Sequence, residues 1–178
     1  LQNPTTRTIS LARRERIAEV ITAHKLPLIE DDAYGFIPPH PPAPLASFAP
    51  DLVWHIGGLA KCIGAGLRLA YTVAPNSHAA RDLAHQLKLV SVMPSPLMMA
   101  LATRWITDGT ADRIRRFIRD ETQARQAIAA QVLDPSMYDS APHAFNVWMR
   151  LPEGISRADV IGQMAGTGVG IMPADAFT

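Results

Sequence analysis

Apolar residues occur along this chain in two patterns, helical spacing and short continuous runs. A first helix is predicted from Ser10, which suits an N-cap, to about His24. Helical spacing recurs over residues 76–90, 97–107 and 110–133. Short apolar runs predict buried strands at 26–29, 52–56 and 69–74. Helices that alternate with short strands indicate an α/β fold with a largely parallel sheet.

The sequence Asp108-Gly109-Thr110 marks a boundary between two helices. We therefore expect one domain over residues 1–108 and a smaller α+β domain over residues 109–178. In the smaller domain we expect strands at 145–151 and 169–172, with a helix capped by Ser156 between them. The segment 37–50 holds six prolines, which predicts an irregular surface loop.

Composition narrows the class of protein. Hydrophobic residues make up 48% of the 178 residues, enough for a packed core. A net charge of +1 argues neither for nor against a nucleic-acid or membrane partner. The most apolar stretch, 90–106, contains prolines, serines and Arg104, so no membrane span is expected. A single cysteine, Cys62, excludes an internal disulfide and suits the reducing cytoplasm, where we expect the protein.

Residues with reactive or ionic side chains fall at the ends of the predicted strands. Asp31 and Tyr34 follow the first strand, Lys61 follows the second after Gly57-Gly58, and Arg68 precedes the third. In an open α/β sheet, ligands bind outside the carboxyl ends of the strands. An amine placed there can form a Schiff base with a carbonyl group, and an acid can hold a protonated pyridine nitrogen.

These segments resemble the pyridoxal-phosphate site of the type I aminotransferase superfamily, and most closely the aminotransferase-like domain of MocR regulators, a group of the GntR-type bacterial transcription factors. Residues 2–6 resemble the family's asparagine-proline loop and residues 29–35 its aspartate-tyrosine motif. Residues 57–61 resemble the motif of the Schiff-base lysine, and residues 66–71 that of the phosphate-binding arginine. With residues 169–173 near the end, the resemblance spans nearly the whole chain.

The resemblance implies a fold and a set of partners. The chain would be the later part of the large pyridoxal-phosphate-binding domain followed by most of the small domain, with the earlier half upstream of Leu1 and a short piece downstream of Thr178. The family implies pyridoxal 5'-phosphate as cofactor, an amino acid or amine as effector, and a homodimer. DNA would be bound only through a winged-helix domain outside this chain. Two alternatives stay open: a free-standing aminotransferase acting on an amino acid and a 2-oxo acid, and a fold relic used only for dimerisation.

The resemblance also implies a role for each site residue. Lys61 would be the Schiff-base lysine, Asp31 the partner of the ring nitrogen, and Arg68 the partner of the phosphate. Tyr34 and Asn3 would hydrogen-bond the phenolic oxygen of the cofactor. The residues by themselves also allow an exposed loop lysine, a solvated acidic turn, a sheet-edge arginine, a core tyrosine and a turn asparagine.

Other features sharpen or limit these expectations. The two-residue period of a strand sends Asp31 to the face opposite both Glu30 and Asp32. Gly58 and Ala60 stand where the family often has serines, so two hydroxyl donors are missing.

Acids interleave with a group of arginines in the long helix, which indicates a solvated helix face and not a nucleic-acid site; the group is Arg113, Arg115, Arg116, Arg119 and Arg125. The six histidines show no spacing typical of metal ligands.

Overall fold

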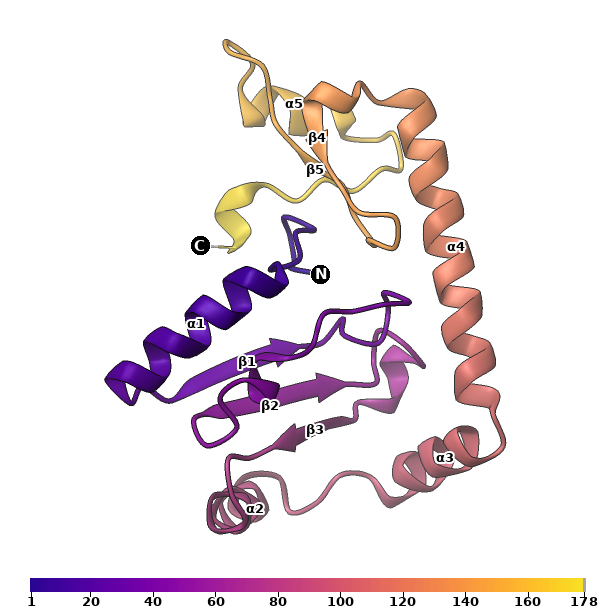
Figure 1. Cartoon of the computed structure of the whole chain (residues 1–178). Helices are drawn as coiled ribbons and strands as arrows, with labels where there is room; N and C mark the ends of the chain where they lie inside the picture. The colour runs from indigo at the N-terminus through magenta and orange to yellow at the C-terminus, as the bar shows by residue number, and fades with distance from the viewer. Residues whose placement is uncertain (178) are drawn as a thin grey trace.

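A computed structural model describes residues 1–177. Helix α1 (Leu11–His24) begins where the Oγ of Ser10 accepts a hydrogen bond from the Arg13 N–H, at 3.3 Å. It ends at Lys25, which adopts the left-handed conformation with φ 52°. The helix lies against a three-stranded sheet built of β1 (Leu28–Asp32), β2 (Val53–Gly58) and β3 (Ala70–Val73) (Figure 1). The predicted cap and helix are therefore confirmed.

The sheet is mixed, in the order β1-β2-β3. Strands β1 and β2 are parallel and joined by a long connection, whereas β2 and β3 are antiparallel. The α/β class is confirmed, but only one of the two strand pairings is parallel. Strand β2 also runs through Gly57 and Gly58, where the sequence predicted its end, because the antiparallel partner β3 continues to pair with both glycines.

Two apolar clusters surround the sheet. The first joins α1 to one face of β2 and to the proline-rich loop through Ala18, Ile21, Leu45, Ala49 and Val53. The second lies where the strands end and where helix α4 passes, and it is formed by Ile37, Cys62, Ile63, Leu67, Ala102 and Ala111. The proline-rich loop is thus anchored at several points: by Ile37 in the second cluster, and by Leu45 and Ala49 in the first, where a short 3-10 turn spans Leu45–Ser47.

Three helices follow the sheet: α2 (Ser77–Ser91), α3 (Pro96–Thr107) and α4 (Thr110–Val132). Figure 1 shows α4 running from α3, beside the sheet, to the C-terminal unit. That unit contains β4 (Tyr138–Asp139), β5 (Trp148–Met149) and α5 (Arg157–Met164), whose N-cap is Ser156 as predicted. Further 3-10 turns lie at Ala65–Leu67, Pro135–Met137 and Ala174–Phe177.

The strands of the C-terminal unit differ most from the sequence-based expectation. The strand expected at 145–151 is reduced to the two residues of β5, which pair with the unpredicted β4. The strand expected at 169–172 is wrong: that segment is irregular. It follows Gly166 and Gly168, which have φ values of 86° and 81°, and no other strand of residues 1–177 pairs with it. A strand without a hydrogen-bonded neighbour has no ladder to stabilise it.

Several exposed apolar side chains follow one another at the end of α2. Leu87, Leu89, Val90, Val92 and Met93, at the end of α2 and just after it, are each more than half exposed. No helix within the described part of the chain is long and apolar enough to cross a membrane. Residues 1–177 also contain no group of three His, Cys, Asp or Glu side chains that could hold a metal ion.

Candidate functional site

One edge of the sheet gathers most of the predicted site residues. Strands β1 and β2 are parallel, so their carboxyl ends lie at the same edge, where Asp32 pairs with Gly57. Strand β3 is antiparallel, so its first residue, Ala70, lies at that edge beside Gly58. Tyr34 follows the end of β1, Lys61 follows the end of β2, and Arg68 precedes the start of β3. The topology therefore brings three segments far apart in sequence to one place.

Lys61 and Tyr34 lie face to face at this edge. The Nζ of Lys61 is 5.6 Å from the centre of the Tyr34 ring, within the range of a cation–π contact. The ring of Tyr34 also contacts the ring of Phe145, from the loop before β5, with 5.7 Å between the two ring centres. Lys61 is exposed and Tyr34 is half-buried. The site thus presents an accessible amine beside a fixed phenol.

Asp31 lies on the face predicted for it. Glu30 is buried on the side of β1 that faces α1, and Asp31, one residue on, is exposed on the opposite side. One oxygen of Asp31 accepts a hydrogen bond from the N–H of Ala33 at 3.1 Å, which leaves the other oxygen outside this turn. Asp32 instead shares a side with Glu30 and lies against Gly35, where an added Cβ would be 2.1 Å from its carboxylate. A side chain at residue 35 would therefore displace the Asp32 carboxylate from the turn that Gly35 N–H closes onto the Asp32 carbonyl oxygen.

Arg68 and Asn3 are both exposed. Arg68 follows the 3-10 turn at Ala65–Leu67 in the left-handed conformation, with φ 51°, which is uncommon for a residue with a side chain. Asn3 precedes Pro4 in a cis peptide bond, in a loop closed by a 2.7 Å hydrogen bond from Thr6 N–H to the Gln2 oxygen. The structure brings Lys61 and Tyr34 into contact, places Arg68 at the same edge, and leaves Asn3 in the neighbouring N-terminal loop.

The N-terminal loop lies close to the end of β1. Leu1, at the start of this loop, is half-buried. Leu1 also packs against the same apolar cluster as Tyr34, Leu59 and Leu69. Three of the four segments that carry the predicted site therefore contribute a residue to one cluster, and Leu1, directly before the fourth segment, joins them.

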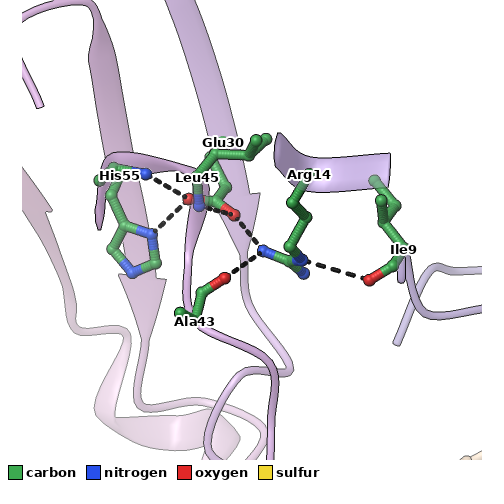
Figure 2. Close-up of polar contacts among 7 residues, drawn as sticks. Ile9, Arg14, Glu30, Ala43, Leu45 and His55 are labelled. Carbon is green, nitrogen blue, oxygen red and sulfur yellow. Dashed lines mark hydrogen bonds and ion pairs between the residues drawn. The ribbon is translucent and has the colours of Figure 1, made fainter. Parts of the chain in front are cut away.

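A buried ionic network next to the site was missed by the sequence analysis (Figure 2). The Glu30 carboxylate accepts from Arg14 at 2.7 Å, from the Leu45 N–H at 3.0 Å and from the Ala46 N–H at 3.4 Å. His55 Nδ1 lies 3.1 Å from the other carboxylate oxygen. Burial alone would raise the pKa of Glu30, but the hydrogen bonds of Leu45, His55 and Ala46 and the Arg14 charge hold it below its usual value. Glu30 lies two residues after the apolar Leu28, and therefore on the same face of the strand. This spacing was the signal in the sequence that could have indicated a buried Glu30.

Arg119 also departs from the expectation of a solvated arginine. Its guanidinium donates to the backbone oxygens of Phe36, Ile37 and Pro38 at 2.9, 2.6 and 3.0 Å. Sequence spacing could not reveal this contact, because it joins residues more than 80 positions apart. Cys62, in contrast, is 3% exposed, and burial raises the pKa of its thiol, as befits a core residue.

Comparison with known proteins decides the family. A model of the family described as aminotransferase class I and II matches residues 1–177. The chain belongs to this family. The uncharacterized HTH-type transcriptional regulator YdeF of Bacillus subtilis is 29% identical over 98% of this chain and 38% of its own length. A second HTH-type regulator of that species, YdfD, is 30% identical over 86% of this chain and 33% of its own length.

A solved aminotransferase has the same fold. The α-aminoadipate aminotransferase LysN of Thermus thermophilus, crystallised with N-(5'-phosphopyridoxyl)-L-leucine, superposes with a TM-score of 0.77 at 26% identity. The match covers 91% of this chain and 44% of LysN. The chain therefore spans less than half the length of these relatives. The predicted fold and family are confirmed, and the roles of Lys61, Asp31, Tyr34, Asn3 and Arg68 stay predictions.

Proposed function

We propose that this chain is part of a pyridoxal-phosphate-binding, aminotransferase-like effector domain of a GntR/MocR-type transcription regulator. The observation that carries the proposal is the Lys61 amine, 5.6 Å from the Tyr34 ring, at the edge where the strands end. The ligand would be an amino acid or amine, and the active form a homodimer in the cytoplasm. DNA would be bound through a separate domain. Residues 1–108 would belong to the cofactor-binding domain and residues 109–178 to the small domain.

The side chains at this edge fit the chemistry of pyridoxal phosphate. They include one exposed amine, one phenol, one exposed guanidinium and one exposed carboxylate, on Lys61, Tyr34, Arg68 and Asp31. When bound, this cofactor supplies an aldehyde that captures amines and a pyridine ring that withdraws electrons. An amine, an acid and an arginine are the partners that an aldehyde, a ring nitrogen and a phosphate require.

Each residue then has a definite task. Lys61 would attach the cofactor through Nζ and would hold a proton at that atom after an amine ligand has displaced it. Asp31, on the exposed face of β1, would keep the ring nitrogen protonated. The hydroxyl of Tyr34 and the amide of Asn3 would donate to the phenolic oxygen. Arg68 would pair with the phosphate through its planar guanidinium.

The residues around Lys61 favour a sensor over a rapid catalyst. A Cβ added to Gly58 would have the Cα of Ala33, at 3.9 Å, as its nearest atom, so a serine would fit there without displacing its neighbours. The missing hydroxyl at Gly58 is therefore not imposed by packing. A sensor needs only a ligand that binds two conformations with different affinity, whereas an enzyme must also release product in each turnover. Weaker phosphate binding is tolerable in the first case.

Reductive trapping tests the cofactor site. Borohydride treatment of the complete protein with pyridoxal phosphate should leave the cofactor covalently attached to Lys61, as read by peptide mass spectrometry. The exposed Lys88 provides the matched control: Lys88→Ala should leave trapping unchanged, and Lys61→Ala should abolish it. Trapping on Lys25 or Lys88 in the wild-type protein would contradict the proposal.

The second candidate is a free-standing aminotransferase, favoured by the 26% identity to LysN. Two measurements on the complete protein separate the candidates: steady-state transamination, and the effect of an amino-acid ligand on a mobility shift with DNA from upstream of its own gene. A regulator should turn over slowly and change its DNA binding. Turnover near the enzyme-typical rate of about 10 per second, without DNA binding, would favour the enzyme.

A further inference from the structure

Helix α4 carries an arginine, Arg119, that donates three hydrogen bonds to one backbone turn. The Nε of Arg119 donates to the Ile37 oxygen at 2.6 Å, and Nη2 donates to the Phe36 and Pro38 oxygens at 2.9 and 3.0 Å. Burial lowers the pKa of this guanidinium, and the neighbouring positive charge of Arg115 adds to the shift. Three hydrogen bonds from one rigid fork hold the turn more precisely than a single flexible amine could.

The turn that Arg119 holds is the one that carries Tyr34. The Ile37 N–H donates to the backbone carbonyl oxygen of Tyr34 at 3.0 Å, and the Gly35 N–H donates to the backbone carbonyl oxygen of Asp32 at 3.0 Å. The side chain of Ile37 is 1% exposed and belongs to the apolar cluster against which Ile114 and Ile118 of α4 pack. The backbone of Tyr34 is therefore joined to α4 by one polar and one apolar anchor.

The same part of α4 holds the loop on the other side of Tyr34. Gln126 lies seven residues after Arg119, on the same face of the helix. Its Nε2 donates to the Ala144 and Asn146 oxygens at 2.8 and 3.1 Å. Between these two residues lies Phe145, whose ring contacts Tyr34 at 5.7 Å. Two side chains of one helix thus set both loops that flank Tyr34.

We propose that Arg119 and Gln126 are positioning residues of the cofactor site, acting through Tyr34. The inference rests on the proposed function, because it takes Tyr34 as the donor to the cofactor's phenolic oxygen. A hydroxyl donates well only within about 3 Å of its acceptor, so a displacement of the turn by about 1 Å weakens the bond steeply. The middle of α4 therefore decides whether Tyr34 can stabilise the ring oxygen as an anion.

The pH midpoint of the cofactor's absorbance change reports this effect. Without the Tyr34 hydrogen bond, the ring oxygen keeps more negative charge and attracts a neighbouring proton more strongly. The pH midpoint of the absorbance change should therefore rise. We expect a rise of roughly 0.5–1 pH unit in Arg119→Lys and a smaller rise in Gln126→Ala, measured in the complete protein with pyridoxal phosphate. The exposed residues Arg116 and Gln123 of the same helix provide matched controls, and Arg116→Lys and Gln123→Ala should leave the midpoint unchanged.

A double variant separates positioning from general loosening of the fold. Tyr34→Phe should raise the midpoint by itself, and Arg119→Lys added to it should produce no further rise. Amide exchange gives a second measurement that needs no cofactor: the peptide 34–38 should exchange faster in Arg119→Lys than in Arg116→Lys. If Arg119→Lys does not fold, Gln126→Ala carries the titration.

The outcomes distinguish this inference from the proposed function. An unchanged midpoint in folded Arg119→Lys and Gln126→Ala, beside a normal wild-type band, would overturn the positioning inference alone. A further rise in the Tyr34→Phe background would overturn the route through Tyr34. A wild-type protein that shows no cofactor band and no reductive trapping would overturn the proposed function, and the positioning inference with it.

Discussion

Neutralising Glu30 should destabilise the fold strongly and in a pH-dependent way. The Glu30 carboxylate is 9% exposed, and four donors converge on it, from Arg14, Leu45, Ala46 and His55 (Figure 2). Glu30→Gln keeps the shape of the side chain and one oxygen but removes the charge. The partly buried Arg14, with a side chain 11% exposed, then lacks its counter-ion.

The magnitude follows from the contacts that are lost. Removing one partner of a buried ion pair outright costs about 3–5 kcal/mol. Glutamine retains one acceptor, but its amide group faces donors where the second oxygen stood, and a buried unsatisfied donor costs about 1–3 kcal/mol. We therefore expect Glu30→Gln to lower the free energy of unfolding by about 2–4 kcal/mol at pH 7. The exposed Glu15 of α1 gives a matched control, and Glu15→Gln should change stability by less than about 0.5 kcal/mol.

The pH dependence identifies the charge as the cause. The folded pKa of Glu30 lies below its ordinary value, so its charge stabilises the folded state at pH values above the unfolded pKa, about 4.3. That stabilisation is lost as the pH falls through the lowered folded pKa. Urea unfolding of the complete protein can be followed by tryptophan fluorescence at pH 7 and in steps below pH 4.5. The free energies of unfolding of the wild type and of Glu30→Gln should converge as the pH falls. A difference that stays constant across this range would refute the reasoning.

Three further predictions follow from packing and exposure. Gly58→Ser should strengthen cofactor binding roughly 2–10-fold in a fluorescence titration, since a hydroxyl fits beside Ala33 and can donate to the phosphate; unchanged or weaker binding would argue against a phosphate near Gly58. Gly57→Ala should cost about 1–3 kcal/mol in chemical unfolding, because its Cβ would lie 2.2 Å from the Tyr71 ring, and a neutral result would mean that this ring moves freely. Residues 1–178 alone should self-associate in light scattering through the exposed apolar end of α2, at Leu89 and Val90, and a monomer at high concentration would contradict this.

The helices and their N-caps could be predicted from the sequence because the spacing of neighbouring side chains controls them. The Ser10 cap, the helices over 77–91, 96–107 and 110–132, and the Ser156 cap depend on side chains within a few residues of one another. The face occupied by Asp31 follows from the two-residue period of any strand. The family resemblance rested on four short motifs, and each of them can be read from a few consecutive residues.

Long-range partners were decided only by the tertiary structure. The expected strand at 169–172 had the right composition but no neighbour to pair with in residues 1–177, and composition carries no information about a neighbour. The sequence assigned no partner to Glu30 and indicated a solvated Arg119, yet Glu30 contacts a histidine 25 positions away and Arg119 donates to three carbonyl groups more than 80 positions away. The contact between Lys61 and Tyr34 arises in the same way, because the parallel pairing of β1 and β2 brings the ends of both strands to one edge. Periodicity selects the face of a residue, whereas its partner depends on how distant segments pack.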